Sequence, residues 1–151
     1  MRVVIQRVKK ASVTIEEKVE GVIKQGFLVL VGIETADTKE DAEWLVNKIV
    51  NQRVFSDEEG KMNLSLKAIN GELLIISQFT LHAQTKKGNR PSFIRAARPE
   101  QAIPLYEYFI ATSNTALGED KIQTGIFGAD MEVALINDGP VTITIDSKNK
   151  E

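Results

Sequence analysis

The side chains best suited to chemistry follow an apolar run at residues 73–76. The four residues that come next are Ser77, Gln78, Phe79 and Thr80. If they continued an extended strand, side chains would alternate, and Thr80 would share a face with His82 but not with Ser77. A hydroxyl beside an imidazole can act as a nucleophile and its base, yet this chemistry also needs a third group that orients the ring. We therefore favour the simpler interpretation, a strand end whose polar groups are satisfied by backbone or water.

Residues 137–140, with the sequence Asn-Asp-Gly-Pro, have the composition of a tight turn between two strands. A cis bond before Pro140 would be a sharper hypothesis, but only about 5–6% of X–Pro bonds in folded proteins are cis, and spacing does not establish one. Arg7 lies among mostly apolar residues, where a half-buried guanidinium needs carbonyls or a carboxylate to bind. We expect it to brace another loop.

Basic residues gather in and after a polar loop at residues 82–91. They are Lys86, Lys87, Arg90, Arg95 and Arg98. Such a run is usually a solvated face, and the functional alternative is a small phosphate-facing patch.

The segment GIFGADM, residues 125–131, places Phe127 and Met131 around the flexible Gly128. Packing in the core is the default interpretation of this pattern. The alternative is a pocket for a flat ligand such as a purine.

Composition excludes several kinds of site. The 151 residues include no cysteine and one histidine, which excludes disulfides, cysteine nucleophiles and multi-histidine zinc centres. The net charge of −2 argues against broad nucleic-acid coating, although contact with one end of an RNA is compatible with it. The N-terminus does not resemble a signal peptide, and the apolar run at residues 27–33 is too short to cross a bilayer. We expect a cytoplasmic protein.

Strand patterns dominate the chain, and two helical patterns interrupt them. Strands are predicted at residues 2–8, 12–15, 19–23, 26–33, 73–77, 131–136 and 141–145. One helix should follow Thr38, which with Asp41 resembles a capping box, and another should begin near Pro99, with Pro104 kinking it or delaying its start. The Asn70-Gly71 pair predicts a hairpin turn.

These patterns predict a strand-rich α+β fold with two main helices in a single domain, residues 1–146, and a frayed tail at 147–151. The apolar strands need cover on both faces, and two helices do not suffice for that. We therefore expect a homodimer in which sheet surfaces contribute to the interface.

Six short motifs, in order, resemble the D-aminoacyl-tRNA deacylases, also called the D-tyrosyl-tRNA deacylase family. They are IQRV, FSDEEGKMN, SQFTL, RPSF, QTGIFGADM and NDGPVT. The resemblance runs from Met1 to about Ile145, which is nearly the whole chain.

The resemblance implies a homodimeric enzyme that hydrolyses the ester between a D-amino acid, or glycine, and the 3′-terminal adenosine of tRNA. It assigns the catalytic segment to Ser77, Gln78, Phe79 and Thr80. It also implies that Gly139 and Pro140 form a Gly-cis-Pro motif that enters the partner's active site and rejects L-amino acids, and that Arg7 holds this motif. Phe127, Gly128 and Met131 would line the adenine pocket, with Gly128 in place of the alanine that many members have. No metal or cofactor is implied.

Two other functions are compatible with the residues. One is a conventional esterase with Thr80 or Ser77 as the nucleophile. The other is a non-catalytic dimer that binds adenine-containing ligands through Phe127 and Met131.

Overall fold

Strand β1 (Arg2–Ile15) organises the sheet, because three other strands pair with it in the computed structural model, which describes residues 1–151. Strand β3 (Gly26–Gly32) pairs with the first half of β1, and β2 (Lys18–Ile23) pairs with the second half. Strand β8 (Glu132–Asp146) runs along the other edge of β1 for nearly its whole length. The two strands predicted at residues 2–8 and 12–15 are therefore one continuous strand.

Two parallel strands extend the sheet beyond β3. Strand β6 (Glu72–Ser77) pairs with β3, and β7 (Ile122–Thr124) pairs with β6. A separate hairpin consists of β4 (Arg53–Ser56) and β5 (Met62–Ser65). The hairpin predicted at Asn70-Gly71 is wrong, because β5 pairs back with β4 while β6 joins β3, and Asn70 only closes the turn before β6.

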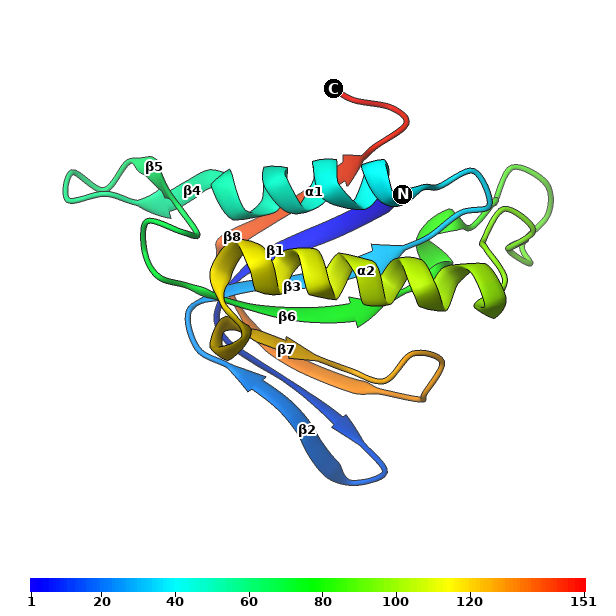
Figure 1. Cartoon of the computed structure of the whole chain (residues 1–151), viewed down its shortest axis with the longest axis horizontal. Helices are drawn as coiled ribbons and strands as arrows, with labels where there is room; N and C mark the ends of the chain where they lie inside the picture. The colour runs from blue at the N-terminus through cyan, green and yellow to red at the C-terminus, as the bar shows by residue number, and fades with distance from the viewer.

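Helices α1 (Lys39–Asn51) and α2 (Pro99–Leu117) lie side by side over one face of the sheet (Figure 1). Helix α1 begins where predicted, and the Asp41 carboxylate accepts a hydrogen bond of 2.8 Å from the backbone N–H of Thr38. Helix α2 begins at Pro99, so Pro104 does not delay its start. The buried apolar residues of α2 are Ala102, Leu105, Tyr106 and Phe109, which recur at helical spacing. None of the helices is both long and apolar enough to span a membrane.

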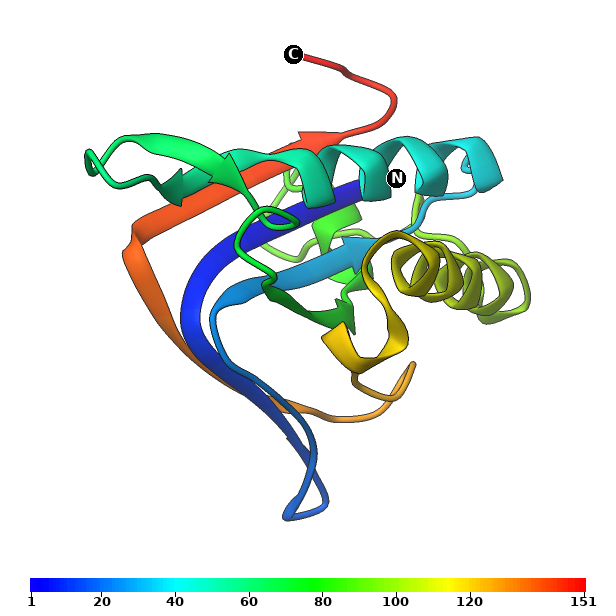
Figure 2. The same cartoon turned by 60° about the vertical axis from the view of Figure 1, so that its left-hand side comes forward.

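Alternate residues of β3 and β6 enter two separate apolar clusters. Phe27 and Ile75 join the large core under the helices, whereas Leu28 and Leu74 join a smaller cluster on the opposite face. The second half of β1, strand β2 and the start of β8 cover that opposite face, because β1 and β8 curve together past β3 (Figure 2). The chain thus covers both faces of its apolar strands by itself, and the packing argument for a dimer does not hold.

The last residues of the chain are tied to the first ones. The backbone N–H of Ser147 donates to the carbonyl of Met1 at 2.9 Å, and the Lys148 ammonium lies 2.8 Å from the Asp41 carboxylate. Two residues of the segment that we expected to fray are therefore held, one against Met1 and the other against α1. The fold is the predicted strand-rich α+β domain with two helices.

Candidate active site

Strand β6 ends at Ser77, and the chain then turns into the 3₁₀ helix η1 (Phe79–His82). The backbone N–H of Gln78 makes the last bond to β3, to the carbonyl of Val31 at 2.7 Å. The expected alternation of side chains through residues 77–82 is therefore wrong, because the backbone is extended only as far as Ser77. In the turn that follows, Thr80 is exposed and His82 is buried.

Thr80 and His82 do not form a nucleophile–base pair. The Thr80 hydroxyl oxygen accepts a hydrogen bond of 2.6 Å from the Gln78 side-chain amide. Neither ring nitrogen of the buried His82 has a hydrogen-bond partner. A hydroxyl nucleophile with a histidine base requires contact between the two groups, so this arrangement does not favour the conventional esterase.

A cavity of about 280 Å³ brings the end of β6 together with the loop between β7 and β8. Ser77, Gln78 and Phe79 line it together with residues 127–131. The predicted site residues that line it are Ser77, Gln78, Phe79, Phe127, Gly128 and Met131. Thr80 comes next in the chain but does not line the cavity.

The wall opposite Ser77 is shaped by close packing of the loop after β7. The ring of Phe127 packs against the Tyr106 ring, with centroids 5.7 Å apart. Burial raises the pKa of the Tyr106 hydroxyl, which donates to the carbonyl of Ile75 at 2.9 Å and so ties helix α2 to β6. Apolar and aromatic walls with a few polar groups at one edge are typical of a small-molecule pocket.

The segment at residues 137–140 is an excursion within β8 rather than the predicted turn between separate strands. Strand β1 pairs Gln6 with Thr142 and then Val8 with Asn137, so residues 138–141 leave the regular pairing opposite Arg7. The Asn137 side chain closes the excursion by accepting a hydrogen bond of 2.7 Å from the backbone N–H of Val141. The turn prediction was wrong because both flanks pair with the same strand.

The buried Arg7 side chain holds this excursion through hydrogen bonds. Its guanidinium Nε donates to the carbonyl of Asp138 at 2.8 Å, and Nη1 donates to the carbonyl of Val54 in β4. The Gly139-Pro140 peptide is cis, and both residues are exposed. Gly139 has a φ of +142°, and a Cβ there would lie 2.8 Å from the Val141 side chain, so only glycine fits without strain.

Gly139 and Pro140 do not line the cavity of their own chain. The structure therefore brings residues 77–79 and 127–131 together and leaves the excursion outside. Sequence reasoning missed Asn137 and Val54 as parts of the support. An asparagine before Asp-Gly is a known local hydrogen-bonding residue and could have been noticed, whereas the Val54 carbonyl gives no sequence signal.

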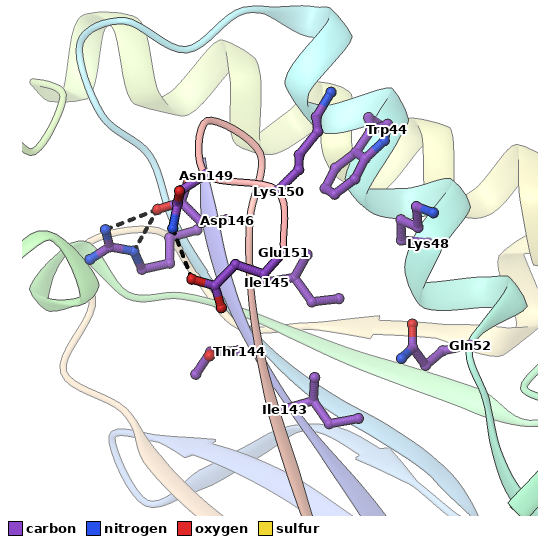
Figure 3. A pocket seen from close by; sticks show the side chains of 11 residues that line it. Trp44, Lys48, Gln52, Ile143, Thr144, Ile145, Asp146, Asn149, Lys150 and Glu151 are labelled. Atoms are coloured by element: carbon purple, nitrogen blue, oxygen red, sulfur yellow. Dashed lines mark hydrogen bonds and ion pairs between the residues drawn. The ribbon is translucent and has the colours of Figure 1, made fainter.

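A larger hollow of about 880 Å³ lies near the C-terminus (Figure 3). Lys150 lies over the Trp44 ring there, at 4.6 Å from its centroid, and Asp146 pairs with Arg2 at 2.9 Å. Burial would raise the pKa of Asp146, but hydrogen bonds from the Lys148 backbone and from Arg2 lower it overall. The charged groups of this hollow are thus engaged with their own neighbours, and it contains none of the predicted site residues. The smaller cavity is the better candidate.

Comparison with known proteins decides the family. The family model described as D-Tyr-tRNA(Tyr) deacylase matches residues 4–146. The chain belongs to this family. The family predicted from the six motifs is thereby confirmed, and it is a family of hydrolases that act on ester bonds.

Named relatives match the whole chain. A D-aminoacyl-tRNA deacylase of Cytophaga hutchinsonii is 68% identical over 151 residues, and one of Flavobacterium psychrophilum is 63% identical over 151 residues, with each chain fully covered. A solved structure titled c-Myc DNA Unwinding Element Binding Protein superposes with a TM-score of 0.93 at 42% identity, covering 97% of this chain and 98% of that one. A probable eukaryotic D-amino acid tRNA deacylase shares the fold, with a TM-score of 0.84 at 18% identity over 95% of this chain and 97% of that one.

Proposed function

We propose that this chain hydrolyses the ester bond between a D-amino acid, or glycine, and the 3′-terminal adenosine of tRNA. It would thereby remove the wrong amino acid from mischarged tRNA in the cytoplasm. The products are free amino acid and tRNA. The observation that carries the proposal is the cavity that residues 77–79 and residues 127–131 line together in a chain of this family. No cofactor or metal enters the reaction as we propose it.

The adenine base would bind between Phe127 and Met131. Both side chains line the cavity, and an aromatic ring and a thioether are suitable partners for a flat heterocycle. The ribose and its ester would then lie toward Ser77 and Gln78 on the opposite wall.

The reaction requires little from the side chains, since an aminoacyl ester is already a reactive electrophile. Attack of water on the carbonyl carbon produces an oxyanion, and the backbone N–H groups of Phe79 and Thr80 are our candidates to stabilise it. They open helix η1, and the first N–H groups of a helix have no partner within it. One such donor is typically worth roughly 2.7–4 kcal/mol. The 2′-OH of the substrate's ribose would assist the attack, so the mechanism needs no protein base and predicts that RNA is required rather than DNA.

Selection of handedness would come from a second copy of the chain. Gly139 and Pro140 are exposed, stand outside their own chain's cavity and are held by Arg7 and Asn137. In a homodimer, their carbonyls would hold the substrate's amino group in the partner's cavity. A D side chain would then point outward, whereas an L side chain would clash with the motif's backbone. Glycine has no side chain to reject and would also be hydrolysed.

The decisive test compares D-tyrosyl-tRNA and L-tyrosyl-tRNA as substrates of the purified chain. We expect release of D-tyrosine and no release of L-tyrosine above the spontaneous rate. Equal cleavage of both would refute the proposal, and tight binding of adenosine without any turnover would select the non-catalytic alternative.

The same comparison on Pro140→Ala tests the role of the excursion. Alanine loses the ring and the fixed φ of proline, so the neighbouring carbonyls are held less firmly. We expect the D-to-L discrimination to fall by about tenfold or more, which corresponds to about 1.4 kcal/mol. Pro99→Ala, at the exposed first residue of α2, is the matched control and should discriminate as the wild type does.

A further inference from the structure

The charge of the chain is unevenly distributed along its sequence. Residues 80–99 contain five lysines and arginines and no aspartate or glutamate, although the whole chain has a net charge of −2. Arg95 pairs with Glu34 at 2.6 Å. The other four cations form no ion pair with the protein, and they are Lys86, Lys87, Arg90 and Arg98. A surface that is merely solvated usually mixes the two signs of charge.

These cations lie on a segment with a defined shape, residues 84–98, which we call the basic arm. Two backbone hydrogen bonds between Gln84 and Ser92, of 2.8 and 3.0 Å, close its outer loop. Lys86, Lys87 and Arg90 are exposed on that loop, which lies beyond η1 at the right of Figure 1. The arm therefore presents its cations outward from a closed base.

The basic arm is fixed to the wall of the cavity. The backbone N–H of Ala97 donates to the carbonyl of Ile33 at 2.9 Å, and both residues line the cavity. Phe93 of the arm packs edge-to-face on Phe79, with ring centroids 5.0 Å apart, and Phe79 lines the cavity while 54% of its surface stays exposed. The arm that carries the unpaired cations is therefore attached to the cavity through Ala97 and through the exposed ring of Phe79.

We propose that the basic arm binds the sugar–phosphate backbone of the tRNA acceptor end as that strand approaches the cavity. The inference rests on the proposed function and specifies which surface recognises the RNA. Unpaired lysines and arginines are the groups that neutralise phosphates, and exposed aromatic rings hold unpaired bases at single-stranded ends. Since these contacts are remote from the ester, they act on RNA binding and not on the choice between D- and L-amino acids.

The salt dependence of binding gives the expected size of the effect. Each phosphate contact on a single strand contributes roughly 0.7 to the slope of log affinity against log salt. Three contacts from Lys86, Lys87 and Arg90 would contribute about 2, and would account for about a 20-fold loss of affinity between 50 and 200 mM salt.

The test is a triple variant of the full chain, Lys86→Gln, Lys87→Gln and Arg90→Gln. Its affinity for uncharged tRNA should fall at least tenfold at low salt, and its salt slope should be smaller by about 2. Hydrolysis of D-tyrosyl-tRNA should show a higher KM with an unchanged kcat. Hydrolysis of D-tyrosyl-adenosine, which has no phosphate, should be unchanged.

The control removes the same charge elsewhere, as Lys24→Gln, Lys48→Gln and Lys67→Gln. These three lysines are exposed, lie outside the basic arm and form no ion pair. Wild-type tRNA affinity and slope in the arm variant, or an equal loss in the control, would overturn the inference. Failure of the proposed function is a separate result, because the wild-type chain would then hydrolyse neither substrate while its tRNA binding still tests the arm.

Discussion

Arg7 and His82 are both buried basic side chains, and each lies beside one part of the candidate site. Arg7 is 8% exposed and binds the 138–141 excursion, and His82 is 2% exposed at the end of η1, just after residues 77–80. The guanidinium of Arg7 donates to two backbone carbonyls, whereas the imidazole of His82 bonds to nothing. Burial alone therefore does not distinguish a group that supports a site from one that fills space.

The hydrogen-bond partners of Arg7 belong to separate parts of the fold. They lie in β4 and in the β8 excursion, so one side chain of β1 connects three segments that are far apart in sequence. The contacts of His82 are only steric, since it packs near Gly32 of β3. We infer that the excursion depends on specific hydrogen bonds and that the end of β6 depends on close packing.

Replacement of Arg7 should have the largest effect. Arg7→Leu leaves the buried carbonyl of Val54 and the part-buried carbonyl of Asp138 without their donor, which we expect to cost about 2–5 kcal/mol of unfolding free energy. Urea unfolding measures the loss, and D-tyrosyl-tRNA hydrolysis at low temperature, where the variant is folded, should show at least a tenfold drop in kcat/KM.

Arg53→Leu is the matched control, because Arg53 is exposed and binds only Asn63. The variant should lose less than about 1 kcal/mol of unfolding free energy, as is usual for substitutions at exposed positions. If the two arginine variants lost equal stability, Arg7 would not be a special support of the excursion.

Local sequence patterns predicted the elements that have a single strong periodicity or cap. Such patterns gave the start of α2 at Pro99, the start of α1 after Thr38 and the buried strand at 26–33. The grouping of 77–80 with 125–131 came from the family resemblance, and physical reasoning from either segment alone left core packing as the default.

The errors arose where pairing over long distances decides the structure. Asn70-Gly71 has ideal hairpin residues, yet β6 pairs with β3 in parallel, so the local turn signal was outweighed. Residues 137–140 also read as a turn, because no local pattern shows that both flanks pair with β1. The curvature of β1 and β8, which covers the second face of the sheet, is likewise absent from the spacing of residues.

Gly32→Ala tests whether packing positions the end of β6. A Cβ at Gly32 would lie 2.9 Å from the Leu81 Cβ and 3.0 Å from the Gln78 carbonyl oxygen, so η1 must shift. We expect a loss of about 1–3 kcal/mol of unfolding free energy, which is typical of overpacking, and a lower kcat for the hydrolysis of D-tyrosyl-tRNA. Thermal unfolding and single-turnover rates measure the two effects, and an unchanged kcat would show that the backbone of 78–82 tolerates displacement.

Like Arg7 and unlike His82, the buried carboxylate of Asp41 has hydrogen-bond partners. Burial would raise its pKa, but hydrogen bonds from Lys148, Ser147 and the Thr38 backbone hold the pKa well below its ordinary value. Asp41→Asn should cost about 1–2 kcal/mol at pH 7, because it weakens the cap of α1 and removes the charge that Lys148 binds.

The difference between wild type and Asp41→Asn should depend on pH. The ionised carboxylate stabilises the folded state above the unfolded pKa of about 3.9, and this stabilisation is lost as pH falls toward the lower folded pKa. Urea unfolding at pH 7 and at about pH 3 should therefore show a smaller difference in acid. A constant difference would mean that the charge of Asp41 contributes nothing.

Replacement of His82 should have the smallest effect and, for one variant, the opposite sign. His82→Leu removes two ring nitrogens that have no hydrogen-bond partner and leaves no protein group without its own partner. Because burying an unsatisfied polar group costs free energy, we expect stability to stay equal or to rise by up to about 1 kcal/mol. His82→Ala removes the same nitrogens but leaves a cavity, so this variant should lose about 2 kcal/mol of unfolding free energy. Hydrolysis of D-tyrosyl-tRNA by His82→Leu should stay within about twofold of wild type across pH, since a residue that only fills space contributes no proton. A folded, stable His82→Leu that had lost activity would instead show that both buried groups serve the reaction.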